Sequence, residues 1–313
     1  MNVYPWQTEQ WQRIKSTYET ERLPHALLFS GRYGLGIGGF AVNISAAILC
    51  DDFSESGIQN EQDRNWQLFR SGNHPDFNHL QPEAEGKQIK VDQIRELIDF
   101  LQYTSQYGRK KIAVIEPAEA LNRNAANGLL KTLEEPPADC LLILVCHQPE
   151  LLPITIRSRC QTIHFDNQLT SQALQWLTDN IDDKSVTELA LNITGTPLAA
   201  KEFIESDLIS ERFELVKELQ VLQNEQVEPI SVAERWNTAA YTTVVLLQSL
   251  FHDMLKLKLI TQYNEIQNND LTKNLRLITK RLDLFSLITC CTLLNDIKRS
   301  IDSTVSYNTQ EMM

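Results

Sequence analysis

The sequence has few of the features that mark a secreted, membrane-bound or metal-rich protein. No run approaches the ~18 uninterrupted apolar residues of a membrane span, and residues 1–25 show neither the basic start nor the apolar core of a secretion signal. The six cysteines include no CxxC pair, the spacing that zinc sites usually need. We therefore expect a cytoplasmic protein whose cysteines are free thiols.

Glycine, proline and basic residues are scarce as well. There are 11 Gly and 11 Pro, too few for a collagenous or low-complexity chain. The 29 Lys and Arg are outnumbered by 41 Asp and Glu, which gives a formal net charge of −12. DNA affinity comes largely from Lys and Arg that displace counterions from phosphates, so this composition weakens the hypothesis of a stand-alone DNA-binding module. A local basic patch could still contact DNA.

The first half of the chain carries an α/β pattern. Short apolar runs alternate with stretches of helical periodicity, which predicts a parallel sheet covered by helices on both faces. The expected strands cover 25–31, 111–115, 141–145 and 162–165, and the expected helices between them cover 40–50, 91–103 and 122–134.

After Phe165 the expected strands stop. The pattern predicts three short helices, over 171–180, 185–194 and 197–204, and mostly helix after about residue 207. The 313 residues suffice for two or three domains. We divide them into an α/β domain (1–166), a small three-helix domain (167–206) and a helical C-terminal domain (207–313).

A glycine-rich loop follows the first strand. On the phosphate-binding template G-x-x-x-x-G-K-[ST], Gly31 and Gly36 take the two glycine positions, with Gly34 between them. Ile37 and Gly38 stand where the template has its lysine and its hydroxyl residue. That lysine reaches the β- and γ-phosphates and that hydroxyl holds Mg²⁺, and neither Ile nor Gly can do so. The loop is therefore a vestigial nucleotide loop or a plain turn, and hydrolysis is disfavoured.

The acidic residue that holds the metal in P-loop ATPases is also altered in this sequence. P-loop ATPases hold the metal with a carboxylate at the end of a neighbouring strand, and an Asp-Glu pair there would also activate water. In this sequence the strand 111–115 is followed by Glu116 and Pro117. Glu116 could face a metal, but a proline cannot polarise water. We therefore expect no nucleotide, no magnesium and no catalysis by the isolated chain.

Two motifs further along the chain carry a family resemblance. Residues 127–137 read NGLLKTLEEPP and residues 158–160 read SRC. With Gly128 as the single change, they resemble the NALLKTLEEPP and Ser-Arg-Cys motifs of the clamp-loader branch of the AAA+ ATPases. The likeness extends in layout to the strand at 25–31 and to the element His74-Pro75-Asp76. It implies an AAA+ α/β domain, a three-helix lid domain and an all-α collar domain for oligomerisation.

The resemblance also implies a role for Arg159. In this family an arginine in Ser-Arg-Cys, here flanked by Ser158 and Cys160, reaches across a subunit boundary to the triphosphate of a neighbouring ATPase. A guanidinium is suited to this because it stays charged and offers a planar fork of donors to phosphate oxygens. The alternative is an ordinary surface ion pair. The lid supports a non-hydrolysing member, because Leu198 falls where motor subunits keep an arginine.

The implied assembly is a hetero-oligomeric ring of motor subunits and a delta subunit, which opens a sliding clamp and places it on primed DNA. The chain would thus be a part of the replicative DNA polymerase holoenzyme, a nucleotidyltransferase complex, without an active site of its own. Two rival hypotheses stay open: a motor-type ATPase with an atypical loop, and a stand-alone DNA-binding module.

One departure from the family concerns zinc. Relatives often carry four cysteines after the first helix, whereas this sequence keeps Cys50 and has residues such as Asn60, Asp63 and Trp66 in place of the others. One thiolate cannot make a tetrahedral site, so we expect no zinc. We expect His74 to form a local hydrogen bond. Lys131, Glu134 and Glu135 read as a solvated helix face.

Overall fold

The computed structural model describes residues 3–54, 62–84, 86–107, 110–166, 171–181, 183–224, 226–237, 239–259 and 266–307. The chain forms two compact units, Met1–Trp176 and Leu177–Met313. Among the residues discussed above, Asn60 lies outside the described ranges. The division into three domains stays a prediction.

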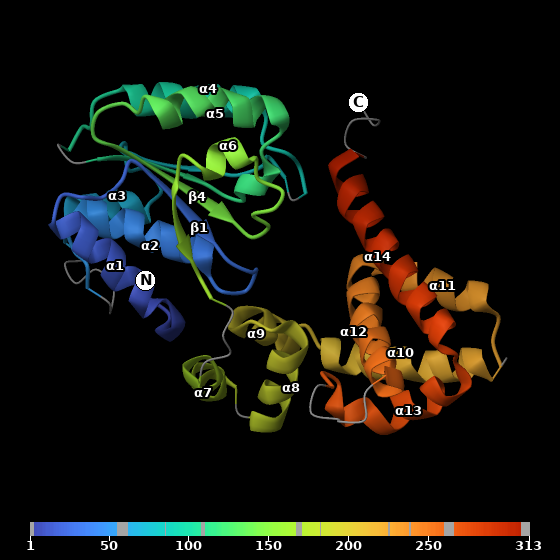
Figure 1. Ribbon diagram of the computed structural model, residues 1–313. Coiled ribbons are helices and arrows are strands. Elements are labelled where there is room, and N and C mark those ends of the chain that lie inside the picture. Colours follow the sequence, from blue (N-terminus) through green and yellow to red (C-terminus); the bar gives the residue numbers. More distant parts are fainter. Residues whose placement is uncertain are drawn as a thin grey trace. The chain divides into compact units, whose positions relative to one another are not determined.

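Unit 1 is built on a parallel sheet of five strands. The strands are β1 (Ala26–Ser30), β2 (Phe77–Leu80), β3 (Lys111–Ile115), β4 (Cys140–Cys146) and β5 (Gln161–His164), in the order β2-β3-β4-β1-β5. Figure 1 shows the sheet between two layers of helices. The helices of this unit are α1 (Thr8–Glu19), α2 (Ile37–Cys50), α3 (Arg64–Arg70), α4 (Val91–Gln102), α5 (Arg123–Glu134), α6 (Ile154–Arg157) and the start of α7 (Ser171–Asn180). The predicted AAA+-type α/β arrangement is confirmed.

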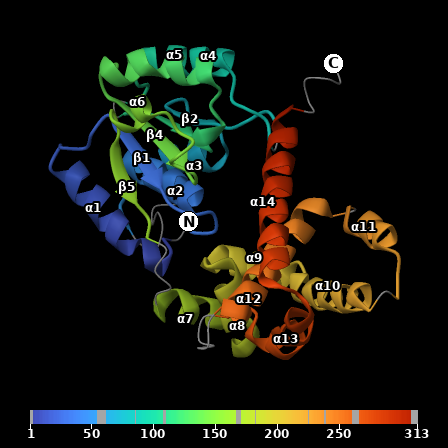
Figure 2. The ribbon, with the colours of Figure 1, turned by 45° about the vertical axis from the view of Figure 1, so that its right-hand side comes forward.

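The three inner strands, β1, β3 and β4, are buried on both faces, and their side chains alternate between two cores. In β1, Leu27 and Phe29 pack with α1, α2 and α3, whereas Leu28 packs with α4 and α5. In β4, Ile143 belongs to the first core and Leu144 to the second. A strand that is covered on both sides needs an uninterrupted apolar run, which is why the sequence revealed these strands. Helices α4 and α5 lie side by side over the second core (Figures 1 and 2).

Strand β2 was not expected from the sequence. It lies at an edge of the sheet and its four residues are only half-buried. Two of these residues, Asn78 and His79, are polar, so the segment has no apolar run. An edge strand is paired on one side only and can carry polar side chains, so local pattern does not reveal it. This strand brings His79 beside β3 in parallel pairing with Val114.

Unit 2 is helical, in agreement with the sequence. Its helices are the end of α7, α8 (Lys184–Thr194), α9 (Pro197–Glu205), α10 (Leu208–Gln223), α11 (Pro229–Asn237), α12 (Ala240–Leu259), α13 (Thr272–Arg281) and α14 (Leu284–Tyr307). Gly195 ends α8 with a left-handed backbone, φ 77°, which a glycine adopts without strain. Within the described ranges, no helix has the length and apolar character to cross a membrane.

A buried ionic network ties the helices of unit 2 together. The guanidinium of Arg212 on α10 is fully buried and donates to both carboxylate oxygens of Asp270, at 3.0 and 2.7 Å. It also donates to Oδ1 of Asn268 at 2.7 Å. Asn268 in turn donates from its backbone and its side chain to Asp253 on α12, both at 2.7 Å. The segment that joins α12 to α13 is thereby anchored by charge-assisted hydrogen bonds.

Candidate functional site

The glycine loop lies at the carboxyl edge of the sheet, where ligands bind in open α/β folds. It leaves β1 at Ser30 and enters α2 at Ile37. Gly34 and Gly36 have φ of 84° and 72°, so the curled backbone that the sequence suggested is present. Because the strands are parallel, the residues after β3 and β4, Glu116 and His147, lie at the same edge.

The loop is held by contacts that the sequence did not reveal. Gln7, which is fully buried, donates from Nε2 to the carbonyl oxygens of Leu35 at 2.8 Å and Gly36 at 3.1 Å. The indole of Trp6 donates to the Leu35 carbonyl at 3.0 Å. On the other side, Nδ1 of His147 lies 3.2 Å from the carbonyl oxygen of Gly31. The loop is thus bonded to other parts of unit 1 at both ends.

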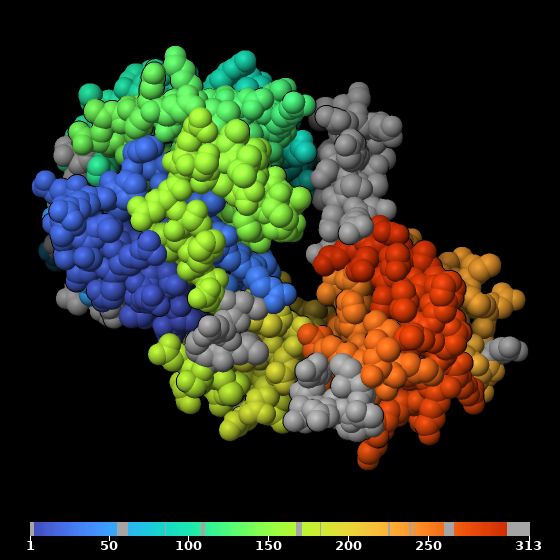
Figure 3. Space-filling model, in the orientation of Figure 1, coloured from blue at the N-terminus to red at the C-terminus, as the bar shows by residue number. Residues whose placement is uncertain are grey.

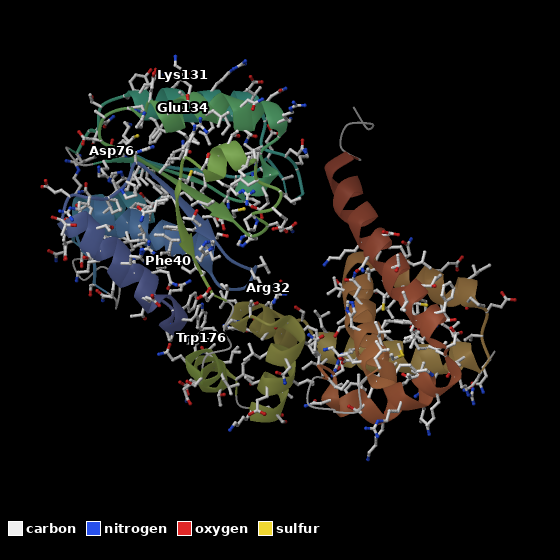
Figure 4. All side chains as sticks on the ribbon, in the orientation of Figure 1. Arg32, Phe40, Asp76, Lys131, Glu134 and Trp176 are labelled. Carbon is white, nitrogen blue, oxygen red and sulfur yellow. The ribbon has the colours of Figure 1, made fainter. Side chains whose placement is uncertain are left out.

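An aromatic cluster lies beside the loop. The rings of Tyr4 and Trp6 are stacked, 4.7 Å between centroids, and the ring of Trp176 meets both edge-on at 5.4 and 5.3 Å. Trp176 lies in the middle of α7 (labelled in Figure 4). Aromatic pairs in these geometries are mutually attractive. Since the Trp6 indole also bonds to Leu35, the cluster fixes the N-terminal segment against the loop.

Ile37 lies in the place of the missing lysine and is buried. Its side chain is 1% exposed and belongs to the core between the sheet and α2. The terminal Cδ1 reaches back beneath the loop, 2.9 Å from where a Cβ on Gly31 would lie. A lysine ammonium at this position would have to leave the core to reach a phosphate.

The Glu116 side chain occupies the space next to Gly38, the residue that stands where the phosphate-binding template has its serine or threonine. A Cβ on Gly38 would lie 1.8 Å from Oε1 of Glu116, so the carboxylate fills the space where a serine or threonine side chain would begin. Its other oxygen, Oε2, is 3.0 Å from Nε2 of His79 on β2. The Glu116 side chain is 20% exposed. Sequence reasoning identified Glu116 but not its partner, because β2 was not foreseen.

Cys146, at the end of β4, is not a reactive thiol. Burial, and then the neighbouring Glu119 carboxylate, raise the pKa of Cys146 well above its ordinary value. The same carboxylate accepts a hydrogen bond from the His147 backbone N–H at 2.9 Å. A thiol is nucleophilic only as thiolate, so this environment favours a structural role.

Arg159 follows α6 and lies at the surface of unit 1. Its Nε and Nη2 donate to the same oxygen of Glu134, Oε1, at 2.9 and 2.5 Å. Its Nη1 donates to the Thr155 carbonyl oxygen at 2.9 Å. The side chains of Arg159 and Glu134 are 35% and 52% exposed. Figure 3 shows the yellow-green segment around α6 at the surface of the unit.

The flanking residues of the Ser-Arg-Cys motif hold its backbone. Ser158 donates from its hydroxyl to the Thr155 carbonyl oxygen at 3.2 Å. Cys160 packs against the core under α5, and burial raises the pKa of its thiol to about 12. The motif therefore places a cysteine inward and an arginine at the surface.

The two family motifs meet in space through the Arg159–Glu134 pair. Lys131 and Glu134 both lie on α5 (Figure 4), where the sequence suggested a face of solvated charges. All three charged residues of that face are exposed, and across the described part of the chain no ion pair joins Lys131 to Glu134 or Glu135. The partner of Glu134 comes instead from a segment that is distant in sequence.

The His74-Pro75-Asp76 element is structural. The Asp76 backbone N–H donates to Nδ1 of His74 at 3.1 Å, so the predicted local hydrogen bond is confirmed. Burial lowers the pKa of His74 below its ordinary 6.5. Burial alone would raise the pKa of Asp76, but hydrogen bonds from the Gln106 and Tyr107 amides and the Ser105 hydroxyl outweigh it and lower the pKa.

Residues that replace the family's zinc cysteines also serve the fold. Asp63 caps α3 by accepting hydrogen bonds from the backbone N–H groups of Asn65 and Trp66, at 2.7 and 3.1 Å. Trp66 is buried in the core with Phe69. A helix cap and a core indole stabilise this segment.

Comparisons with known proteins agree with the two motifs. Residues 6–169 match the family described as "DNA polymerase III, delta subunit", and residues 206–312 match "DNA polymerase III, delta subunit, C terminal". The DNA polymerase III subunit delta' of Pseudomonas aeruginosa is 34% identical over 265 residues, covering 80% of each chain. The DNA polymerase III subunit delta' of Yersinia pestis is 34% identical over 264 residues, covering 82% of this chain and 77% of that protein.

Among solved structures, the chain is similar to a DNA polymerase III gamma subunit-related protein from Thermotoga maritima. The two are 19% identical, the TM-score is 0.44, and the match covers 92% of this chain and 99% of that one.

Proposed function

The chain belongs to the delta' subunits of DNA polymerase III, in the clamp-loader AAA+ family, and we propose that it serves there without hydrolysing ATP. Its contribution to catalysis is the Arg159 guanidinium, which it supplies to the triphosphate held by a neighbouring ATPase subunit. The chain itself binds neither nucleotide nor magnesium.

The proposal that the chain supplies an arginine to a neighbouring subunit is carried by the placement of Arg159. The side chain is 35% exposed, at the surface of unit 1, and follows a short helix whose Ile156 is fully buried. An arginine supplied in trans must lie at the surface on a rigid support, and the exposure of Arg159 and the burial of Ile156 support this role. Such arginines raise the rate of phosphoryl transfer by about 10³–10⁵-fold in well-studied NTPases.

Two contacts support the absence of a nucleotide. Ile37 is uncharged and packs into the core, so no side-chain cation stands at this position to meet the phosphates. The Glu116 carboxylate lies against Gly38, so an anion at the start of α2 would face a negative charge. Both effects oppose phosphate binding at a helix N-terminus, which depends on free backbone N–H groups and a positive local potential.

The proposed partners follow from family membership. They are the motor subunits and the delta subunit of a hetero-oligomeric ring, with the sliding clamp and primed DNA engaged by the assembled loader. The net charge of −12 fits a chain that meets DNA as part of an assembly.

The test is reconstitution of the ring with wild-type chain, Arg159→Ala or Lys131→Ala. Lys131 is an exposed cation on α5 and serves as the matched control. We expect Arg159→Ala to lower DNA-stimulated hydrolysis at the neighbouring site by on the order of 10³-fold, and to impair clamp loading while the ring still assembles. Lys131→Ala should match wild type. An unchanged rate with Arg159→Ala would remove the proposed role.

Nucleotide binding by the isolated chain separates this function from the motor-type ATPase. Titration with ATP and magnesium should show no saturable binding. Micromolar affinity with turnover would favour the motor hypothesis, and tight, salt-sensitive DNA binding by the isolated chain would favour a DNA-binding module.

A further inference from the structure

We propose that Glu134 is a positioning residue for Arg159. It holds the guanidinium by its Nε–Nη2 edge, so that the adjoining end-on edge, Nη1–Nη2, is presented to the neighbouring subunit's phosphate. This inference rests on the proposed function of Arg159, and it assigns a role to the first glutamate of the LEEPP segment.

The hydrogen bonds of Arg159 define which edge is held. A guanidinium has five N–H donors in a planar fork. Nε and Nη2 each use one on Oε1 of Glu134, and Nη1 uses one on the Thr155 carbonyl oxygen. The remaining contact, Nη1 to the Ser158 hydroxyl, is 3.5 Å long, at the outer limit of a hydrogen bond.

Glu134 and the other contacts of Arg159 leave one part of the fork unoccupied by the carboxylate. Glu134 occupies the Nε–Nη2 edge of the fork, and among the described residues Nη2 has no acceptor other than Glu134. The end-on edge, formed by Nη1 and Nη2, is therefore not the edge that Glu134 holds. Two parallel N–H donors suit two oxygens of a phosphate, which is the bidentate geometry that arginine favours. The Glu134 contact therefore leaves the phosphate-binding edge available while it restrains the rotation of the side chain.

Both residues stand on rigid supports. Glu134 is the last residue of α5, and the preceding Leu133 is buried, with its carbonyl oxygen 3.0 Å from Nε2 of His25 beside β1. Pro136 follows closely and cannot continue the helix. On the other side, Ile156 and Cys160 anchor the segment that carries Arg159.

Positioning matters because an arginine that must act across a subunit boundary has a long and flexible side chain. A misplacement of about 1 Å at a reacting centre can lower a rate by up to 10²-fold. Without Glu134 the guanidinium samples more orientations, and fewer of them present the end-on edge. The expected loss is smaller than the loss on removing Arg159 itself, since the charge is still present.

The experiment compares Glu134→Ala, Glu134→Gln and Glu135→Ala in the reconstituted ring. Glu135 is the matched control, because it is the adjacent exposed glutamate with the same charge and makes no described contact with Arg159. We expect Glu134→Ala to lower the maximal ATPase rate by about 10-fold, with an unchanged KM for ATP and normal assembly. Glu134→Gln keeps the acceptor oxygen and should retain part of the rate, and Glu135→Ala should match wild type.

A double variant makes the result decisive. If Glu134 acts through Arg159, adding Glu134→Ala to Arg159→Ala should cause no further loss. An equal loss in both backgrounds would show an effect independent of the arginine and overturn the proposal. An unchanged or higher rate with Glu134→Ala would also overturn it, the latter by showing that the carboxylate competes with phosphate. If Arg159→Ala itself has no effect, the proposed function fails first.

Discussion

Replacement of Gly38 by alanine should destabilise unit 1, whereas the same change at the adjacent Gly39 should stabilise it. Both glycines lie in the first turn of α2. A Cβ on Gly39 meets no atom within 4 Å, but a Cβ on Gly38 would lie 1.8 Å from the Glu116 carboxylate. Comparing the stabilities of the Gly38→Ala and Gly39→Ala variants therefore separates the general effect of an alanine in a helix from the specific effect of the Glu116 carboxylate.

The expected change in the free energy of unfolding depends on whether the Glu116 side chain has to move. Alanine in place of glycine within a helix is worth about 0.5–1 kcal/mol, and Gly39→Ala should gain this amount. For Gly38→Ala, Glu116 must swing away and lose its hydrogen bond to His79, which is 3.0 Å long. A hydrogen bond to a charged group contributes about 1.5–3 kcal/mol. We expect a net destabilisation of about 1 kcal/mol for Gly38→Ala.

Urea unfolding followed by tryptophan fluorescence measures both changes, since Trp11 and Trp66 lie in the core of unit 1. The midpoint should fall for Gly38→Ala and rise for Gly39→Ala with an unchanged slope. In a Glu116→Ala background the sign at Gly38 should reverse to a gain, a coupling of about 1.5–2 kcal/mol. Equal stabilisation by the two alanines in the wild-type background would refute the assignment of Glu116 to this space.

Two further predictions concern stability. Arg212→Ala should destabilise unit 2 by about 3–5 kcal/mol, because it leaves Asp270 without its buried partner; thermal unfolding measures this, and a loss below 1 kcal/mol would contradict it. Acid should also destabilise unit 1. The lowered pKa of His74 gives stability that is present above pH 6.5 and is lost as the pH falls through 6.5 toward the lower folded value. The lowered pKa of Asp76 gives stability that is present above its unfolded value and is lost at still lower pH, as the pH falls through its folded value. Urea midpoints at pH 7.5 and 5.5 should differ more for wild type than for His74→Gln; equal differences would argue against a neutral, buried His74.

The fold could be predicted from the sequence where buried elements show an unbroken apolar run or a regular amphipathic pattern. Strands β1, β3 and β4 contain the apolar runs 26–29, 112–115 and 140–146 because helices cover both faces of the sheet. The amphipathic pattern of α4 and α5 follows from their single buried face. Strand β2 gave no such signal, because its place at the sheet edge and its pairing with β3 are set by residues outside it.

The sequence by itself determined which chemical groups are available. It shows that no lysine or hydroxyl stands at Ile37 and Gly38, and that an arginine stands within Ser-Arg-Cys, since these statements depend on residue identity alone. Only the tertiary structure decided where those groups point. The contact of Glu116 with Gly38 and the contact of Glu134 with Arg159 each join segments that are distant along the chain. Such contacts arise from the order of strands in the sheet and from the packing of helices on it. The local periodicity of apolar residues predicts neither of these.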